Sequence, residues 1–144
     1  MSIFLYACES WTLTTELEKR ITSFEFRCYI KLLNAHYKEH TSNETIRTKI
    51  TESIGKHKSL LEIVKERKLK RFGHTTRITG LPKFVLQGTV PGKQKRGRPR
   101  KKWLDNISEW TGLSIEEATR TAENRSKWRA VVWSSSSAPQ QRPP

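Results

Sequence analysis

The sequence predicts a mainly α-helical protein, with five or six helices in two small subdomains, an extended basic arm between them and a disordered C-terminal tail. Apolar residues recur at helical spacing along most of the chain. Between the two groups of helices, Gly97 and Pro99 interrupt a run of Lys and Arg and prevent a regular helix there. Four capping-box patterns mark helix N-termini: Thr15–Glu18, Thr41–Glu44, Ser59–Glu62 and Ser114–Glu117.

The first helix is expected over residues 16–33, with Thr15 as its N-cap. It follows residues 1–12, whose apolar run 3–8 fits a short strand or the stump of a longer element. A second apolar face begins at Phe26, and a helix that is apolar all round at one end is buried between two partners. This helix is therefore either the centre of the core or a docking surface for another subunit. One face carries Leu17, Ile21, Phe24, Cys28 and Leu32.

The rest of the first subdomain, residues 13–80, is expected to hold two more helices. A short one carries Ile46 and Ile50 and ends at Gly55. The next begins after Ser59, and its apolar face continues beyond Glu66 with basic residues. Either the helix breaks near Glu66, or Lys and Arg stems lie along the edge of the core.

The second subdomain is expected to be an αα-hairpin over residues 100–133, after a linker at 81–99. Pro99 suits the first turn of its first helix, and Gly112 ends that helix. A second helix runs from Ser114 to about Val132. Residues 134–144 read as a disordered tail. The apolar positions of these helices predict that Trp103, Trp110 and Trp128 pack in the core.

The charge predicts a polyanionic partner, DNA or RNA, because the net charge is +14 and the sequence pI is about 10.2. The basic residues gather in two places. A cluster at residues 65–71 is either a solvated helix face or a contact to nucleic acid, for which we single out Arg67, Lys68 and Arg71. The arm carries the other candidates: Lys93, Lys95, Arg96, Gly97, Arg98, Pro99, Arg100, Lys101 and Lys102.

The centre of the arm, Arg96-Gly97-Arg98-Pro99, is similar to the core of an AT-hook, which lies in the narrow minor groove of A·T-rich DNA. The flanking cations would contact phosphates. Three other readings stay open: RNA binding by the same arm, a nuclear localisation signal, and a solvated linker.

Enzyme, metal and membrane functions are not expected. The chain has one Asp, at position 105, so it cannot hold an aspartate-based two-metal site, and it contains no P-loop or nucleophile-elbow motif. His36 and His40 with Cys28 lack the paired cysteines of a zinc site, and Cys8 and Cys28 read as free thiols. We expect no cofactor, no membrane span and no signal peptide.

Short motifs along the chain are similar to a known family. In order they are YACESWTL (6–13), EKRI (18–21), FRCY (26–29), RKLKRFGH (67–74), GKQKRGRPRKKW (92–103), DNI (105–107), WTGL (110–113) and the Arg125, Trp128 and Arg129 set. Together they resemble the C-terminal segment of the endonuclease–reverse transcriptases of non-LTR (LINE-type) retrotransposons. Arg71 stands where that pattern has an aromatic residue, and Cys8 where it has Ser or Gly.

This resemblance implies a truncated copy of a segment that lies downstream of an RNA-directed DNA polymerase, without that enzyme's catalytic residues. It implies an accessory segment, inactive alone, that binds template RNA or target DNA next to the missing polymerase domain. Nuclear localisation is favoured over cytoplasmic. Two alternatives remain: a protein-interaction module that docks on a polymerase or other subunit, and a segment that assists catalysis in trans.

Overall fold

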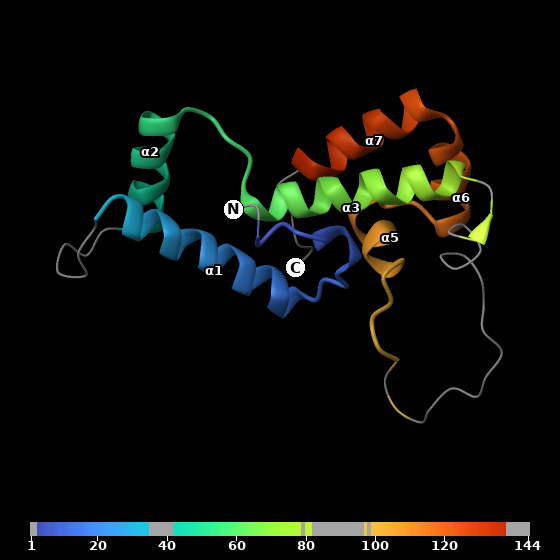
Figure 1. Ribbon diagram of the computed structural model, residues 1–144, viewed down its shortest axis with the longest axis horizontal. Helices are drawn as coiled ribbons and strands as arrows, with labels where there is room; N and C mark the ends of the chain where they lie inside the picture. Colours follow the sequence, from blue (N-terminus) through green and yellow to red (C-terminus); the bar gives the residue numbers. More distant parts are fainter. Residues whose placement is uncertain (1–2, 35–41, 79, 82–96, 98, 138–144) are drawn as a thin grey trace. The chain divides into compact units, whose positions relative to one another are not determined.

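The computed structural model describes residues 3–34, 42–78, 80–81, 97 and 99–137, and their regular structure is entirely helical (Figure 1). The expected mainly-α class is confirmed. No strand occurs among these residues, and none of their helices is long and apolar enough to cross a membrane. In chain order the elements are the 3₁₀ turn η1 (Cys8–Ser10), α1 (Thr15–Leu32), α2 (Asn43–Ile54), α3 (Leu60–Arg77), α5 (Asp105–Thr111), α6 (Ile115–Glu123) and α7 (Arg125–Ser137).

The chain divides into two compact units, and the division falls inside α3. One unit is Thr14–Ile63; the other combines Met1–Leu13 with Val64–Pro144. This differs from the expected boundaries, which placed the whole stretch 13–80 in one subdomain. Below we call the two parts the α1–α2 unit and the α3–α7 unit.

In the α1–α2 unit, α1 begins one residue earlier than expected. The N-cap is Thr14, whose side chain accepts a hydrogen bond from the Leu17 amide at 3.3 Å. Of the five residues expected on its apolar face, Ile21 is buried, whereas Leu17, Phe24 and Leu32 are 39%, 40% and 66% exposed. The buried acid Glu25 instead accepts hydrogen bonds from the Leu60 amide and the Tyr29 hydroxyl. The predicted apolar face is therefore mostly exposed, so the alternative in which α1 is the centre of the core does not hold within this unit.

Helix α2 agrees with the sequence at its core and at its end. Ile46 and Ile50 are buried, and Gly55 ends the helix with φ +83° while its amide donates to the Thr51 carbonyl. The N-cap is Ser42, and the expected cap Thr41 lies outside the described residues. The capping box of the next helix is confirmed, because Ser59 and Glu62 each accept a hydrogen bond from the other's amide.

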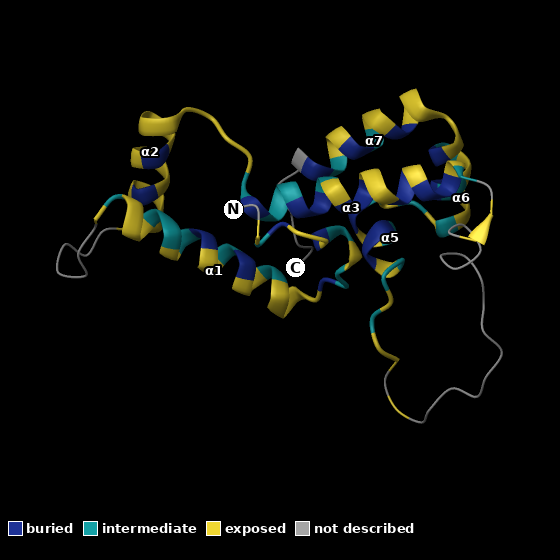
Figure 2. Cartoon of the chain, in the orientation of Figure 1, coloured by how far each residue is buried: buried dark blue, intermediate teal, exposed yellow. Residues whose placement is uncertain are grey.

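Helix α3 is continuous through Glu66, so the predicted alternative of a break there is wrong. Its buried stripe includes Val64, Leu69 and Phe72, all fully buried (Figure 2). Helix α7 packs on it through Trp128, whose indole Nε1 donates to the Leu69 carbonyl at 3.0 Å. At the same contact, a Cβ on Gly73 would collide with the Trp128 ring. A larger residue at position 73 therefore requires the Trp128 ring to move.

The C-terminal part holds three helices where the sequence predicted a two-helix hairpin. Helix α5 begins at Asp105, later than Pro99 suggests, and ends at Gly112 in the left-handed conformation. The Ser114–Glu117 capping box is confirmed. The helix it opens ends at Glu123, because the Asn124 side chain accepts hydrogen bonds from the amides of Ser126 and Lys127 and so caps a new helix.

The last helix also corrects the expected tail. Helix α7 continues to Ser137, so residues 134–137 are helical, and 138–144 lie outside the described residues. Trp110 and Trp128 are buried as expected, whereas Trp103 is half-buried. The indole Nε1 of Trp110 is buried and has no hydrogen-bond partner among the described residues.

Candidate nucleic-acid interface

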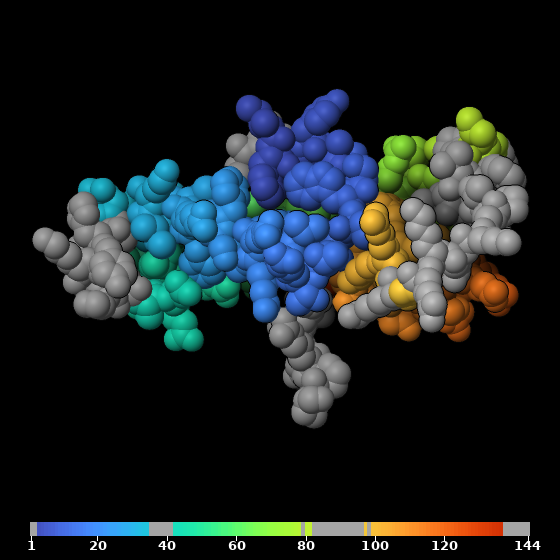
Figure 3. All heavy atoms as spheres, turned by 90° about the horizontal axis from the view of Figure 1, so that it is seen from below, coloured from blue at the N-terminus to red at the C-terminus, as the bar shows by residue number. Residues whose placement is uncertain are grey.

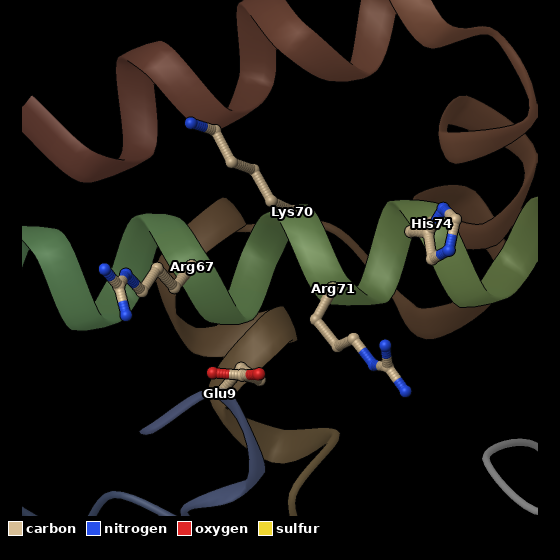
Figure 4. Close-up of a pocket in the computed structure, with 5 residues that line it drawn as sticks. All are labelled: Glu9, Arg67, Lys70, Arg71 and His74. Atoms are coloured by element: carbon tan, nitrogen blue, oxygen red, sulfur yellow. The ribbon is translucent and has the colours of Figure 1, made fainter. Parts of the chain in front are cut away.

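The exposed side of α3 carries four nitrogen-bearing side chains in a row: Arg67, Lys70, Arg71 and His74. Their spacing of three, four and seven residues places them on one face of the helix, opposite the buried stripe. Together with Glu9 from η1 they line an open depression of about 390 Å³ (Figure 4). We call Arg67, Lys70, Arg71 and His74 the α3 basic face.

Two of these side chains also have partners within the protein. An Nη atom of Arg67 donates to the Leu5 carbonyl at 3.0 Å, and Lys70 pairs with Glu66 at 2.6 Å. No described residue forms an ion pair with Arg71 or His74. The Lys70 side chain is 65% exposed, so its pair with Glu66 contributes little to stability and can give way to an anion. In Figure 4, Lys70 points toward α7, whereas Arg71 lies on the side of Glu9.

Lys68 is not part of this face, although the sequence placed it among the nucleic-acid contacts. It is fully buried, and its Nζ donates to the Trp11 carbonyl and to Oδ1 of Asn106, both at 2.7 Å. The Trp103 ring centroid lies 4.6 Å from the same nitrogen. Burial, with a smaller contribution from nearby Lys101, lowers the pKa of Lys68 from 10.5 to about 7. Lys68 therefore acts as a core residue.

Asn106 connects this buried amine to the N-terminal segment. Its Oδ1 also accepts from the Leu13 amide at 2.8 Å, and its Nδ2 donates to the Leu13 carbonyl at 2.7 Å. The side chain of Asn106 is fully buried and all its polar atoms are bonded. These bonds hold α3, α5 and the segment before α1 together, which sets η1 beside the α3 basic face.

Glu9 is positioned by contacts of its main chain. The indole Nε1 of Trp103 donates to the Glu9 carbonyl at 2.9 Å, and the preceding Cys8 is fully buried. Figure 3 shows the N-terminal segment and the residues before α5 lying side by side. No described residue forms a salt bridge with the Glu9 carboxylate, which accepts a weak hydrogen bond from the Cys8 thiol at 3.9 Å. Burial raises the pKa of that thiol.

The basic arm is described in part. Lys93, Lys95, Arg96 and Arg98 lie outside the described residues, as do His36 and His40. Gly97 is exposed with φ +121°, and Pro99, Arg100 and Lys102 are exposed. Lys101 forms an ion pair with Glu109, and the next residues lead into Trp103, which packs against Phe72 of α3. The arm's C-terminal end is thereby anchored to the same core as the α3 basic face.

The sequence placed Arg67, Lys70 and Arg71 in one basic cluster, although it did not single out Lys70. It missed His74 and Glu9 as members of the same site. The spacing of 67, 70, 71 and 74 was a usable signal once α3 is known to be continuous. Glu9 had no such signal, because its place depends on hydrogen bonds to residues about ninety positions away.

Among the described residues, no group of three or more His, Cys, Asp or Glu is placed to hold a metal ion. No protein-family model matches the chain, and no curated protein or solved structure matches it either.

Proposed function

We propose that this protein binds nucleic acid, with the α3 basic face and the basic arm as its contacts to phosphate. The observation that carries the proposal is the exposed row of Arg67, Lys70, Arg71 and His74 on a helix whose other side is fixed in the core. A net charge of +14 supports it, since a polyanion neutralises such an excess.

The resemblance to the C-terminal segment of non-LTR reverse transcriptases supplies the biological setting of the proposal. In that setting the chain is an accessory segment, without catalysis of its own, that holds template RNA or target DNA for a polymerase. Arg71 fits this role, because it adds a cation to the exposed face at a position where the family pattern has an aromatic residue.

The test is a comparison of two charge-matched double variants of the full chain. Lys70→Ala with Arg71→Ala removes two cations from the α3 basic face, and Lys127→Ala with Arg129→Ala removes two exposed cations from α7. Binding to single-stranded and duplex nucleic acids of equal length is measured by fluorescence anisotropy. We expect the first pair to weaken binding by roughly tenfold per lost phosphate contact at about 0.1 M salt.

The α7 pair controls for net charge, because it lowers the total charge by the same amount. Equal losses for both pairs would mean that the chain attracts polyanions through its overall charge and has no defined site. Unchanged affinity for the α3 pair would overturn the proposed interface.

A further inference from the structure

Besides Glu66, which pairs with Lys70, a second carboxylate lies near the α3 basic face. Glu9 lines the same depression as Arg67, Lys70, Arg71 and His74. A carboxylate beside bound phosphates repels them, so a site for phosphate alone would be better without it. Glu9 would favour binding only for a ligand that offers a hydrogen-bond donor next to its phosphates.

The carboxylate is available for such a donor. The Glu9 main chain is held in place because the Trp103 indole Nε1 donates to the Glu9 carbonyl at 2.9 Å, and the preceding residue, Cys8, is fully buried. No described residue forms a salt bridge with it. An ionised carboxylate accepts hydrogen bonds and donates none. Glu9 is thus a positioned acceptor at the edge of a cationic depression.

We propose that Glu9 accepts a hydrogen bond from a ribose 2′-hydroxyl while the cations of the α3 basic face bind the adjacent phosphates, so that this site prefers RNA to DNA. The inference rests on the proposed function. The sugar–phosphate backbone of DNA carries no hydrogen-bond donor, whereas each ribose of RNA carries one, and this group lets a protein distinguish the two at a given site. The depression therefore matches the RNA backbone. The phosphates of the RNA can pair with the cations of the α3 basic face, and a ribose hydroxyl can donate to Glu9.

The experiment measures a ratio of affinities, so that the general effect of charge cancels. The full chain, Glu9→Ala and Glu9→Gln are titrated with single-stranded RNA, DNA of the same sequence, and 2′-O-methyl RNA, which keeps the ribose oxygen but lacks the donor. Glu123→Ala serves as the control, since it removes one exposed carboxylate of the same unit at the end of α6.

We expect the wild-type chain to bind RNA more tightly than DNA or 2′-O-methyl RNA. Glu9→Ala should lower the RNA-to-DNA affinity ratio by about tenfold, the scale of one hydrogen bond to a charged acceptor. Glu9→Gln keeps a neutral acceptor and should lose less. Glu123→Ala should leave the ratio unchanged.

Three results would overturn the inference. If both Glu9 variants strengthen binding to all three ligands equally, the carboxylate merely repels phosphate, and the proposed nucleic-acid binding still stands. If Glu9→Ala weakens the binding of all three ligands equally, the hydrogen-bond donor belongs to the bases and not to the ribose. If neither the wild-type chain nor any variant binds any of the three ligands measurably, the inference falls together with the proposed function.

Discussion

The Nζ atom of Lys68 lies 2.7 Å from Oδ1 of Asn106, and both side chains are fully buried. The contact joins the middle of α3 to the start of α5, and Asn106 extends it to both main-chain polar groups of Leu13. A basic residue that reads as a surface cation in the sequence is thus a central hydrogen-bond donor of the α3–α7 unit.

Lys68→Met should destabilise the protein. Methionine fills a similar volume but donates no hydrogen bond, so the Trp11 carbonyl loses its Lys68 partner. An unsatisfied buried acceptor costs about 1–3 kcal/mol of unfolding free energy. Urea denaturation followed by circular dichroism measures the change. Lys70→Met, two residues along on the exposed side, is the control and should change the unfolding free energy little.

The stability that Lys68 contributes should increase with pH. Its pKa is about 7 in the folded protein and 10.5 when unperturbed, so between these values the unfolded chain binds the extra proton. The free energy of unfolding then rises with pH by at most about 1.4 kcal/mol per unit. The neutral amine of Lys68 still has two N–H groups, one for the Trp11 carbonyl and one for Oδ1 of Asn106. Denaturation curves at several pH values should show this rise in the wild-type chain and a smaller one in Lys68→Met. An equal rise in the unfolding free energy of both proteins would contradict the prediction.

The sequence predicted most of the helices because their signals are local. The capping boxes at Ser59 and Ser114 and the C-caps at Gly55 and Gly112 depend on residues a few positions apart, and each is where the pattern placed it. The break at Asn124 is also local, but the apolar positions on either side suggested one continuous helix.

The candidate site was less predictable because it depends on contacts between distant segments. Lys68 could be told from Arg67 and Arg71 only by its acceptors, Trp11 and Asn106, which lie 57 and 38 residues away. The sequence could not decide between a core helix and a docking surface at α1 for a related reason. Apolar spacing identifies a face but not what covers it, and within its own unit that face is largely exposed.

Gly73→Ala should destabilise the protein, against the usual effect of this change in a helix. Alanine is normally favoured over glycine in a helix interior by about 1 kcal/mol. Here the new Cβ would collide with Cδ1 and Nε1 of Trp128. Overpacking of this kind typically costs about 1–3 kcal/mol. Thermal denaturation should show a lower midpoint, and stabilisation would contradict the close packing of α7 on α3.

A double-mutant cycle identifies the cause of that loss. Trp128→Ala removes both ring atoms that the new methyl group would meet, so the double variant should cost less than the sum of the two single changes. Additive costs would place the strain elsewhere in α3.

The most direct test of the central claim is the salt dependence of nucleic-acid binding by the full chain and by the Lys70→Ala, Arg71→Ala double variant. If six or seven cations contact phosphate, wild-type affinity should fall about 10³-fold or more between about 50 and 200 mM salt. The double variant should show a slope of log K against log salt that is shallower by nearly 2, since each phosphate contact contributes about 0.9. Equal slopes for the two proteins would contradict the account, because the α3 basic face would then make no contact with the phosphate backbone.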